Sequence, residues 1–114
     1  MIERNEQTPI MHRVVKHGGV LYLGGMAATD KSLDIRGQTE QTLARIEELL
    51  NRYGSSKQQV LTATVYLTDL ANKEALNEVW QSFFSPDILP TRATVGVAQL
   101  AKGTLIEMVV TAAA

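Results

Sequence analysis

The sequence predicts an α+β domain in which a single β-sheet carries two helices on one face. From Gln59 to Thr68, apolar and polar residues alternate with the period of two that a half-buried strand shows. Two other segments repeat apolar residues every three to four positions, as helices packed against a sheet do. Four further short apolar runs give the order β-β-α-β-α-β-β. The 114 residues are enough for one hydrophobic core, so residues 1–114 are predicted to form one domain.

The first two strands are expected to follow a loose arm of residues 1–9. The segments Ile10 to Lys16 and Val20 to Ala28 are predicted to be strands around a turn at Gly18 and Gly19. The second segment is almost entirely apolar or small, which predicts cover on both of its faces. Within it, Gly24-Gly25 indicates a bulge or a close approach of another backbone or a ligand.

Both helices are predicted from their apolar stripes. The first, from Gly37 to Tyr53, ends at Gly54, and its stripe consists of Leu43, Ile46, Leu49, Leu50 and Tyr53. The second runs from Asn72, a candidate N-cap, to Phe84, and its stripe consists of Leu76, Val79, Trp80 and Phe83. The strand between the helices is predicted to bury Leu61, Ala63, Val65 and Leu67. Pro86 and Pro90 then favour an extended connection.

The last two strands each hold one charged residue in an apolar or small run. They span Pro90 to Val97, which contains Arg92, and Leu105 to Val110, which contains Glu107. Because strands close in sequence usually pair, we expect these two strands to be neighbours. The first and last strands are apolar on both faces, whereas two helices cover only one face. We therefore expect a second copy of the chain to cover the other face, which predicts a homo-oligomer.

Composition narrows the classes of function. The formal net charge is −1, which gives no indication of a nucleic-acid or membrane partner. The absence of cysteine excludes disulfides and thiolate catalysis. His12 and His17 do not have metal-ligand spacing, so no metal site is predicted. The polar start of the chain and the lack of a long apolar run predict a cytoplasmic protein.

Arg92 and Glu107 are the candidate functional residues, and each has a structural alternative. Arg92 and Thr94 point one way along their strand; if Ala93 and Val95 face the helices, Arg92 faces the subunit interface. There it either anchors a small carboxylate or joins an ion pair. Glu107 either acts as a general base for water, or pairs with Arg92 or reaches solvent at the edge of the sheet. Asn77 either offers its amide to a ligand or is solvated.

Several separated motifs resemble the Rid family, also called YjgF-like proteins. Pro90-x-Arg92-Ala93-x-Val95 and Ile106-Glu107 are similar to the C-terminal signature of that family. The stretch Val65 to Leu70, the pattern Asn77-x-x-Trp80-x-x-Phe83-Phe84 and Leu23-Gly24-Gly25 also match in order and spacing. The resemblance covers residues 10–112.

The resemblance implies a chorismate-mutase-like fold, assembled as a homotrimer with clefts between subunits. It also implies hydrolysis of 2-imino acids and enamines to 2-keto acids and ammonia, without a cofactor. Arg92 would hold the substrate carboxylate, Glu107 would activate water, backbone amides near Gly25 and Thr94 would orient the substrate, and Asn77 would support them.

The chain departs from the family pattern in the pocket wall. Met11-His12 stands where typical members have a tyrosine, Gly24 where they have a serine, and Thr94 where many have a cysteine. A different amino- or imino-acid substrate is one consequence. A non-catalytic trimer that binds small carboxylate metabolites is the alternative function.

Overall fold

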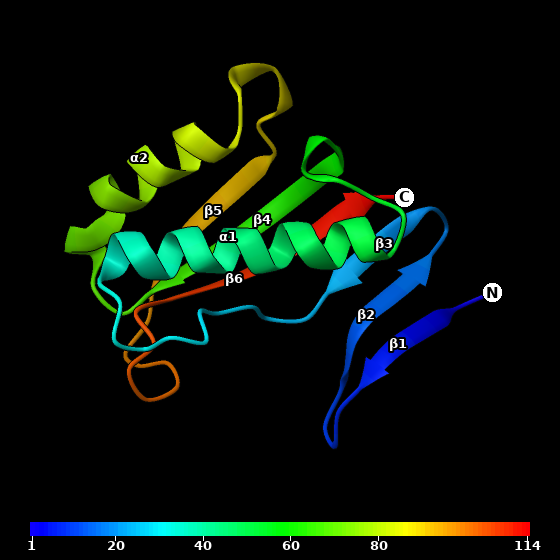
Figure 1. The fold of residues 1–114 in the computed structure, drawn as a ribbon, viewed down its shortest axis with the longest axis horizontal. Coiled ribbons are helices and arrows are strands. Elements are labelled where there is room, and N and C mark those ends of the chain that lie inside the picture. Colours follow the sequence, from blue (N-terminus) through cyan, green and yellow to red (C-terminus); the bar gives the residue numbers. More distant parts are fainter.

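Two helices lie across the same face of a six-stranded sheet (Figure 1) in the computed structural model, which describes residues 1–114. The strands are β1 (Glu3–Gln7), β2 (His12–His17), β3 (Val20–Leu23), β4 (Val60–Leu67), β5 (Thr91–Gly96) and β6 (Ile106–Ala113), and the helices are α1 (Ile35–Arg52) and α2 (Lys73–Phe83). The sheet order is β1-β2-β3-β6-β4-β5, and only β4 and β5 are parallel. The predicted α+β class, with one sheet and both helices on one face, is confirmed.

Local sequence explains where α1 begins and ends. The carboxylate of Asp34 accepts a hydrogen bond from the Gly37 amide at 2.8 Å, which satisfies one of the free N–H groups of the first turn. After Arg52, Gly54 adopts a φ of 83°, a conformation that glycine takes without penalty. At α2, Asn72 occupies the N-cap position but makes no capping hydrogen bond with its side chain, while Asp69 accepts one from Ala71 in the preceding turn.

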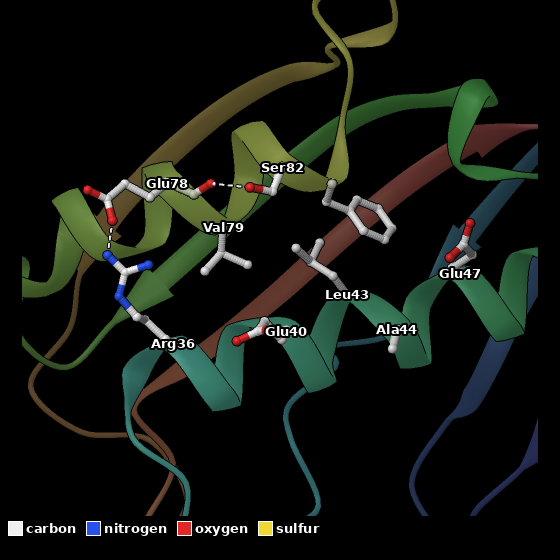
Figure 2. Close-up of a pocket in the computed structure, with 9 residues that line it drawn as sticks. Arg36, Glu40, Leu43, Ala44, Glu47, Glu78, Val79 and Ser82 are labelled. Atoms are coloured by element: carbon white, nitrogen blue, oxygen red, sulfur yellow. Dashed lines mark hydrogen bonds and ion pairs between the residues drawn. The ribbon is translucent and has the colours of Figure 1, made fainter.

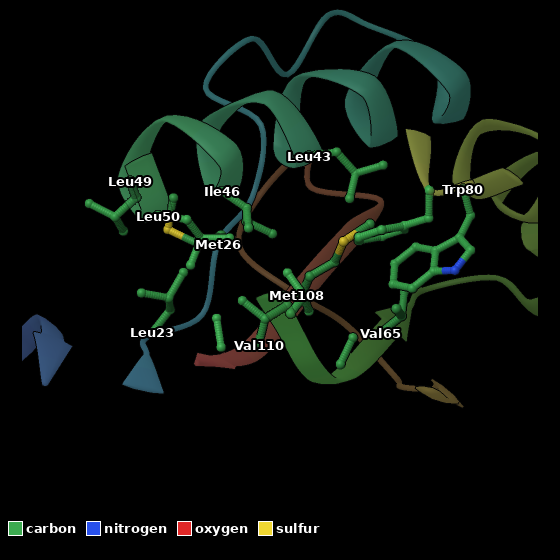
Figure 3. Close-up of a cluster of buried hydrophobic side chains, with 14 of the residues drawn as sticks. Leu23, Met26, Leu43, Ile46, Leu49, Leu50, Val65, Trp80, Met108 and Val110 are labelled. Atoms are coloured by element: carbon green, nitrogen blue, oxygen red, sulfur yellow. The ribbon is translucent and has the colours of Figure 1, made fainter. Parts of the chain in front are cut away.

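The core lies between the helices and the central strands. Figure 3 shows the α1 side chains Leu43, Ile46, Leu49 and Leu50 above Met108, Val110 and Val65 of the sheet, with Trp80 of α2 beside them. The predicted stripe of α1 is therefore confirmed. In β6 the burial alternates, with Ile106, Met108, Val110 and Ala112 buried and the residues between them half-buried.

Three sequence predictions about the strands are wrong. Residues 1–9 do not form a loose arm, because β1 pairs antiparallel with β2. The charged side chains of β1 suit an exposed edge strand, but they lack the apolar alternation from which a strand is predicted. The strand that starts at Val20 ends at Leu23, and Met26 then forms an isolated bridge to Met108. Leu61 is 44% exposed because the register shifts between Val60 and Thr62, so that Val60 takes its place in the core.

The predicted pairing of β5 with β6 is also wrong, because β4 lies between them. The segment β4-α2-β5 forms a crossover that sets β5 parallel to β4 at the edge of the sheet, and β6 fills the place between β3 and β4. Arg92 and Glu107 are therefore separated by a whole strand.

The face of the sheet opposite the helices is uncovered in the single chain. It exposes the apolar side chains of Tyr22, Leu61 and Val95, and Val109 is half-buried among them. Apolar residues are thus present on both faces of β3, which begins at Val20, and of the last strand β6. Neither helix has the length and apolar composition needed for a bilayer crossing.

Candidate functional site

Arg92 lies on the edge strand β5 and faces the helices. Its register partner is Ala63, which is buried beneath them, and Thr94 in the same row pairs with the buried Val65. The condition under which Arg92 would face away from the helices, that Ala93 and Val95 face them, is therefore not met. The strand itself contains no signal for its orientation, since both of its faces carry small or apolar residues; the parallel register with β4 decides it.

The helix α2 holds the guanidinium of Arg92 in place. Arg92 donates a hydrogen bond from Nη2 to Oδ1 of Asn77 at 2.5 Å, and its Cζ lies 5.1 Å from the centroid of the Trp80 ring. Asn77 and Trp80 are three residues apart and so share a helix face. No carboxylate lies within ion-pair distance of Arg92. Burial lowers the pKa of Arg92, yet the guanidinium stays protonated as arginine does in proteins.

A cavity of about 330 Å³ opens beside this guanidinium. Its lining consists of Asn77, Trp80, Gln81, Leu89, Pro90 and Arg92. Arg92 is its only charged residue, so the cavity suits a small organic anion whose remaining groups are apolar or neutral. Sequence reasoning missed Gln81 and Leu89 and assigned Trp80 only to the core. The spacing of Asn77 and Trp80 was the available signal that both lie near one site.

Glu107 lies on β6 and faces the uncovered side of the sheet. It stands opposite Tyr66 of β4, and its side chain makes neither an ion pair nor a hydrogen bond within the chain. Its carboxylate rests against Gly25: a Cβ added at that glycine would lie 2.5 Å from Oε2 of Glu107. A group does come close at Gly25, but it is this side chain and not the backbone or ligand that the sequence predicted.

Backbone hydrogen bonds fix the glycine segment beside Glu107. The amide of Met26 donates to the Met108 carbonyl at 2.8 Å, and the Met108 amide donates back at 2.9 Å. The amide of Gly25 donates no hydrogen bond to the backbone of the chain, so it is free to meet a ligand. At the neighbouring Gly24, an added Cβ would lie 3.1 Å from Sδ of Met11, so the thioether fills the space beside this glycine. His12 pairs in register with Gln7 on β1.

Comparison with known proteins identifies the family. The profile described as Endoribonuclease L-PSP matches residues 5–114. The chain belongs to this family, the YjgF/Rid family. A RutC family protein of Haemophilus ducreyi is 33% identical over 99% of this chain and 97% of its own length. A YjgF family member from Neisseria meningitidis has a TM-score of 0.93 and 29% identity, covering 99% of this chain and 94% of that one. The structure of an uncharacterized protein from Pseudomonas aeruginosa has a TM-score of 0.94 and 36% identity, and the match covers 99% of this chain and 98% of that one.

In this YjgF/Rid family member, the predicted site residues fall into two sets on opposite faces of the sheet. Arg92, Asn77 and Thr94 lie on the helix side, whereas Glu107 and Gly25 lie on the uncovered side. The alternative in which Glu107 pairs with Arg92 of its own chain is therefore wrong. Neither charge is neutralised within the chain, and each remains available to a group from outside it.

Proposed function

We propose that this protein hydrolyses 2-imino acids and their enamine tautomers to 2-keto acids and ammonia, in clefts between the copies of a homotrimer. Family membership is consistent with this chemistry. The observation that carries the proposal is the Arg92 guanidinium, which has no carboxylate partner and is held by Asn77 at the wall of a cavity of about 330 Å³. Such a group is an anchor for the carboxylate of a small acid.

Arg92 acts by binding and orientation. Two parallel N–H groups of a guanidinium match the two oxygens of a carboxylate, and this fixes the position of C2 of the substrate. Because the Asn77 amide and the Trp80 ring already hold the guanidinium, little freedom is lost when the substrate binds. The apolar side of the cavity, formed by Trp80 and Leu89, receives the substrate side chain.

Glu107 acts as general base and then as general acid. Its carboxylate takes a proton from water while the water oxygen forms a bond to C2 of the protonated imine, and the electron pair of the C=N bond moves to nitrogen, which gives a neutral carbinolamine. The protonated Glu107 then donates this proton to the carbinolamine nitrogen. The C–N bond breaks and ammonia leaves, while the C2 hydroxyl gives its proton back to the Glu107 carboxylate and becomes the ketone. The free amide of Gly25 and the backbone near Thr94 orient the substrate.

A complete site needs two copies of the chain. Arg92 and Glu107 of one chain occupy opposite faces of the sheet with β4 between them, so a water on Glu107 cannot reach a substrate held by the same chain's Arg92. We therefore place the reaction where Arg92 of one copy faces Glu107 of the next. The uncovered apolar face that bears Glu107 is the surface that assembly would bury.

The test is an imine-hydrolysis assay. An amino-acid oxidase generates 2-imino acids from several amino acids, and the decay of the imine is followed by competition with semicarbazide. We expect acceleration by the wild-type protein, loss of activity in Arg92→Ala and Glu107→Gln, and an unchanged oligomer in both by sedimentation. Full activity of Arg92→Ala would show that Arg92 does not anchor the substrate carboxylate. Equal rates for wild type and Glu107→Gln would show that Glu107 is not the general base.

The second candidate is a non-catalytic protein that binds small carboxylates in the same cavity. The departures from the family pattern at Met11 and Gly24 favour it, since they change the wall and leave Arg92 in place. It predicts an increase in Tm with 2-keto acids, as binding to the folded state requires, without faster imine decay. Some relatives carry the name endoribonuclease; for this chain, a net charge of −1 gives no electrostatic support for RNA binding.

A further inference from the structure

A second hollow lies on the outer surface of the helix layer, between α1 and α2. Its volume is about 570 Å³, larger than that of the cavity beside Arg92. Figure 2 shows Arg36 and Glu78 joined across one end of it, with Glu47 toward the other end. The groove follows α1 from Arg36 to Glu47, a stretch about 16 Å long at 1.5 Å per residue.

The floor of the groove is apolar. It is formed by Leu43 and Ala44 of α1 and by Val79 and Phe83 of α2. Val79 and Phe83 are only half-buried and Ala44 is exposed, so this apolar surface is accessible from outside the chain. The Phe83 ring already attracts one cation, since Nζ of Lys57 lies 4.7 Å from its centroid.

The rim of the groove is acidic. It holds three glutamates and one arginine. Glu78 is paired with Arg36, while Glu40 and Glu47 have no ion-pair partner in the chain. These two glutamates are seven residues apart, which places them on one side of α1 about 10.5 Å from each other along its axis. The groove therefore presents two negative charges beside a strip of apolar surface.

We propose that this groove docks a basic amphipathic helix of a partner protein. An apolar strip between two helices is a surface into which a third helix packs its side chains. Basic residues spaced seven apart on that helix would match Glu40 and Glu47. The charge of the rim disfavours an anionic ligand and also α1 of a second copy, whose exposed side carries the same glutamates. Docking here is independent of the proposed reaction, because the groove shares no residue with the cavity beside Arg92.

The experiment uses a fluorescent 18-residue synthetic helix with a leucine stripe and lysines seven residues apart, titrated with the full-length protein and followed by anisotropy. We expect saturable binding that weakens with added salt. The double variant Glu40→Lys/Glu47→Lys should weaken binding at least tenfold, and Ala44→Trp, which adds a bulky side chain to the apolar lining of the groove, should do the same. The matched control Glu3→Lys/Glu74→Lys changes the net charge equally at exposed positions outside the groove and should bind within about twofold of wild type.

Four outcomes would overturn the proposal. They are a lack of saturable binding, an equal loss in the control variant, equal binding of a counterpart peptide with glutamate in place of lysine, and a change of oligomeric state in the groove variants. The last would show that a second copy of the chain occupies the groove. Circular dichroism of each variant establishes that it is folded, and unchanged imine-hydrolysis activity keeps this test separate from that of the proposed reaction.

Discussion

Replacing Gly25 by alanine tests the placement of Glu107 most directly. The added Cβ would lie 2.5 Å from Oε2 and 3.1 Å from Cδ of Glu107, whereas ordinary contacts begin near 3.4 Å. The carboxylate must therefore move by about 0.9 Å. Since a misplacement of ~1 Å can lower a rate about 100-fold, we expect kcat to fall by that factor, which is about 2.7 kcal/mol in the activation free energy.

The same substitution should leave the fold largely intact. Gly25 does not have a positive φ, so alanine restricts the unfolded chain and adds about 0.4–1 kcal/mol of stability. Crowding against Glu107 offsets this by about 1–3 kcal/mol. The matched control is Gly24→Ala, whose nearest neighbour is the flexible thioether of Met11 at 3.1 Å. Steady-state kinetics decide the question: a folded Gly25→Ala oligomer with wild-type kcat would refute the reasoning, and an equal loss in Gly24→Ala would attribute the effect to the backbone.

Three further variants test other contacts. Asn77→Leu removes the acceptor for Arg92 Nη2, and we expect KM to rise about tenfold with a smaller change in kcat, measured by steady-state kinetics. Met108→Ala opens a cavity beneath α1 and should lower the free energy of unfolding by about 2–5 kcal/mol, measured in urea; a loss below ~1 kcal/mol would contradict its place in the core. Hydrogen bonds from Tyr53 and Arg52 lower the pKa of Glu6 from 4.5, so its contribution to stability is present above pH 4.5 and is lost as the pH falls through the lowered pKa. The Tm difference between wild type and Glu6→Gln should therefore narrow below about pH 4, and a constant difference would contradict this.

Where one physical signal dominates, the sequence predicts the structure well. The stripe of Leu43, Ile46 and Leu49 places α1 over the sheet because the helical period leaves no other way to bury these side chains. Asn77 and Trp80 are brought to one place by helix geometry alone. In contrast, β1 has no apolar alternation, and only its pairing with β2 makes it a strand.

The relation between Arg92 and Glu107 could not be read from the sequence. Proximity along the chain favoured pairing of their strands, but the crossover through α2 carries β5 to the outside of β4. The register between β5 and β4 determines on which face of the sheet the Arg92 side chain lies, and no residue of β5 indicates that face. The bulge that turns Leu61 outward is likewise a property of two strands together.

The opposite facing of Arg92 and Glu107 makes assembly a condition of the proposed chemistry. Because Arg92 and Glu107 lie on opposite faces of one sheet, they cannot pair with each other within the chain. Both charges therefore stay available to a substrate, and the chain does not have to hold them apart across an empty internal cavity. Packing the uncovered face of one copy against the β5 edge of another would bury Tyr22 and Val95 and would close the site in the same step. In the proposed assembly, the exposed apolar face that would be costly for a monomer would drive association, and the same surface would carry the proposed base, Glu107.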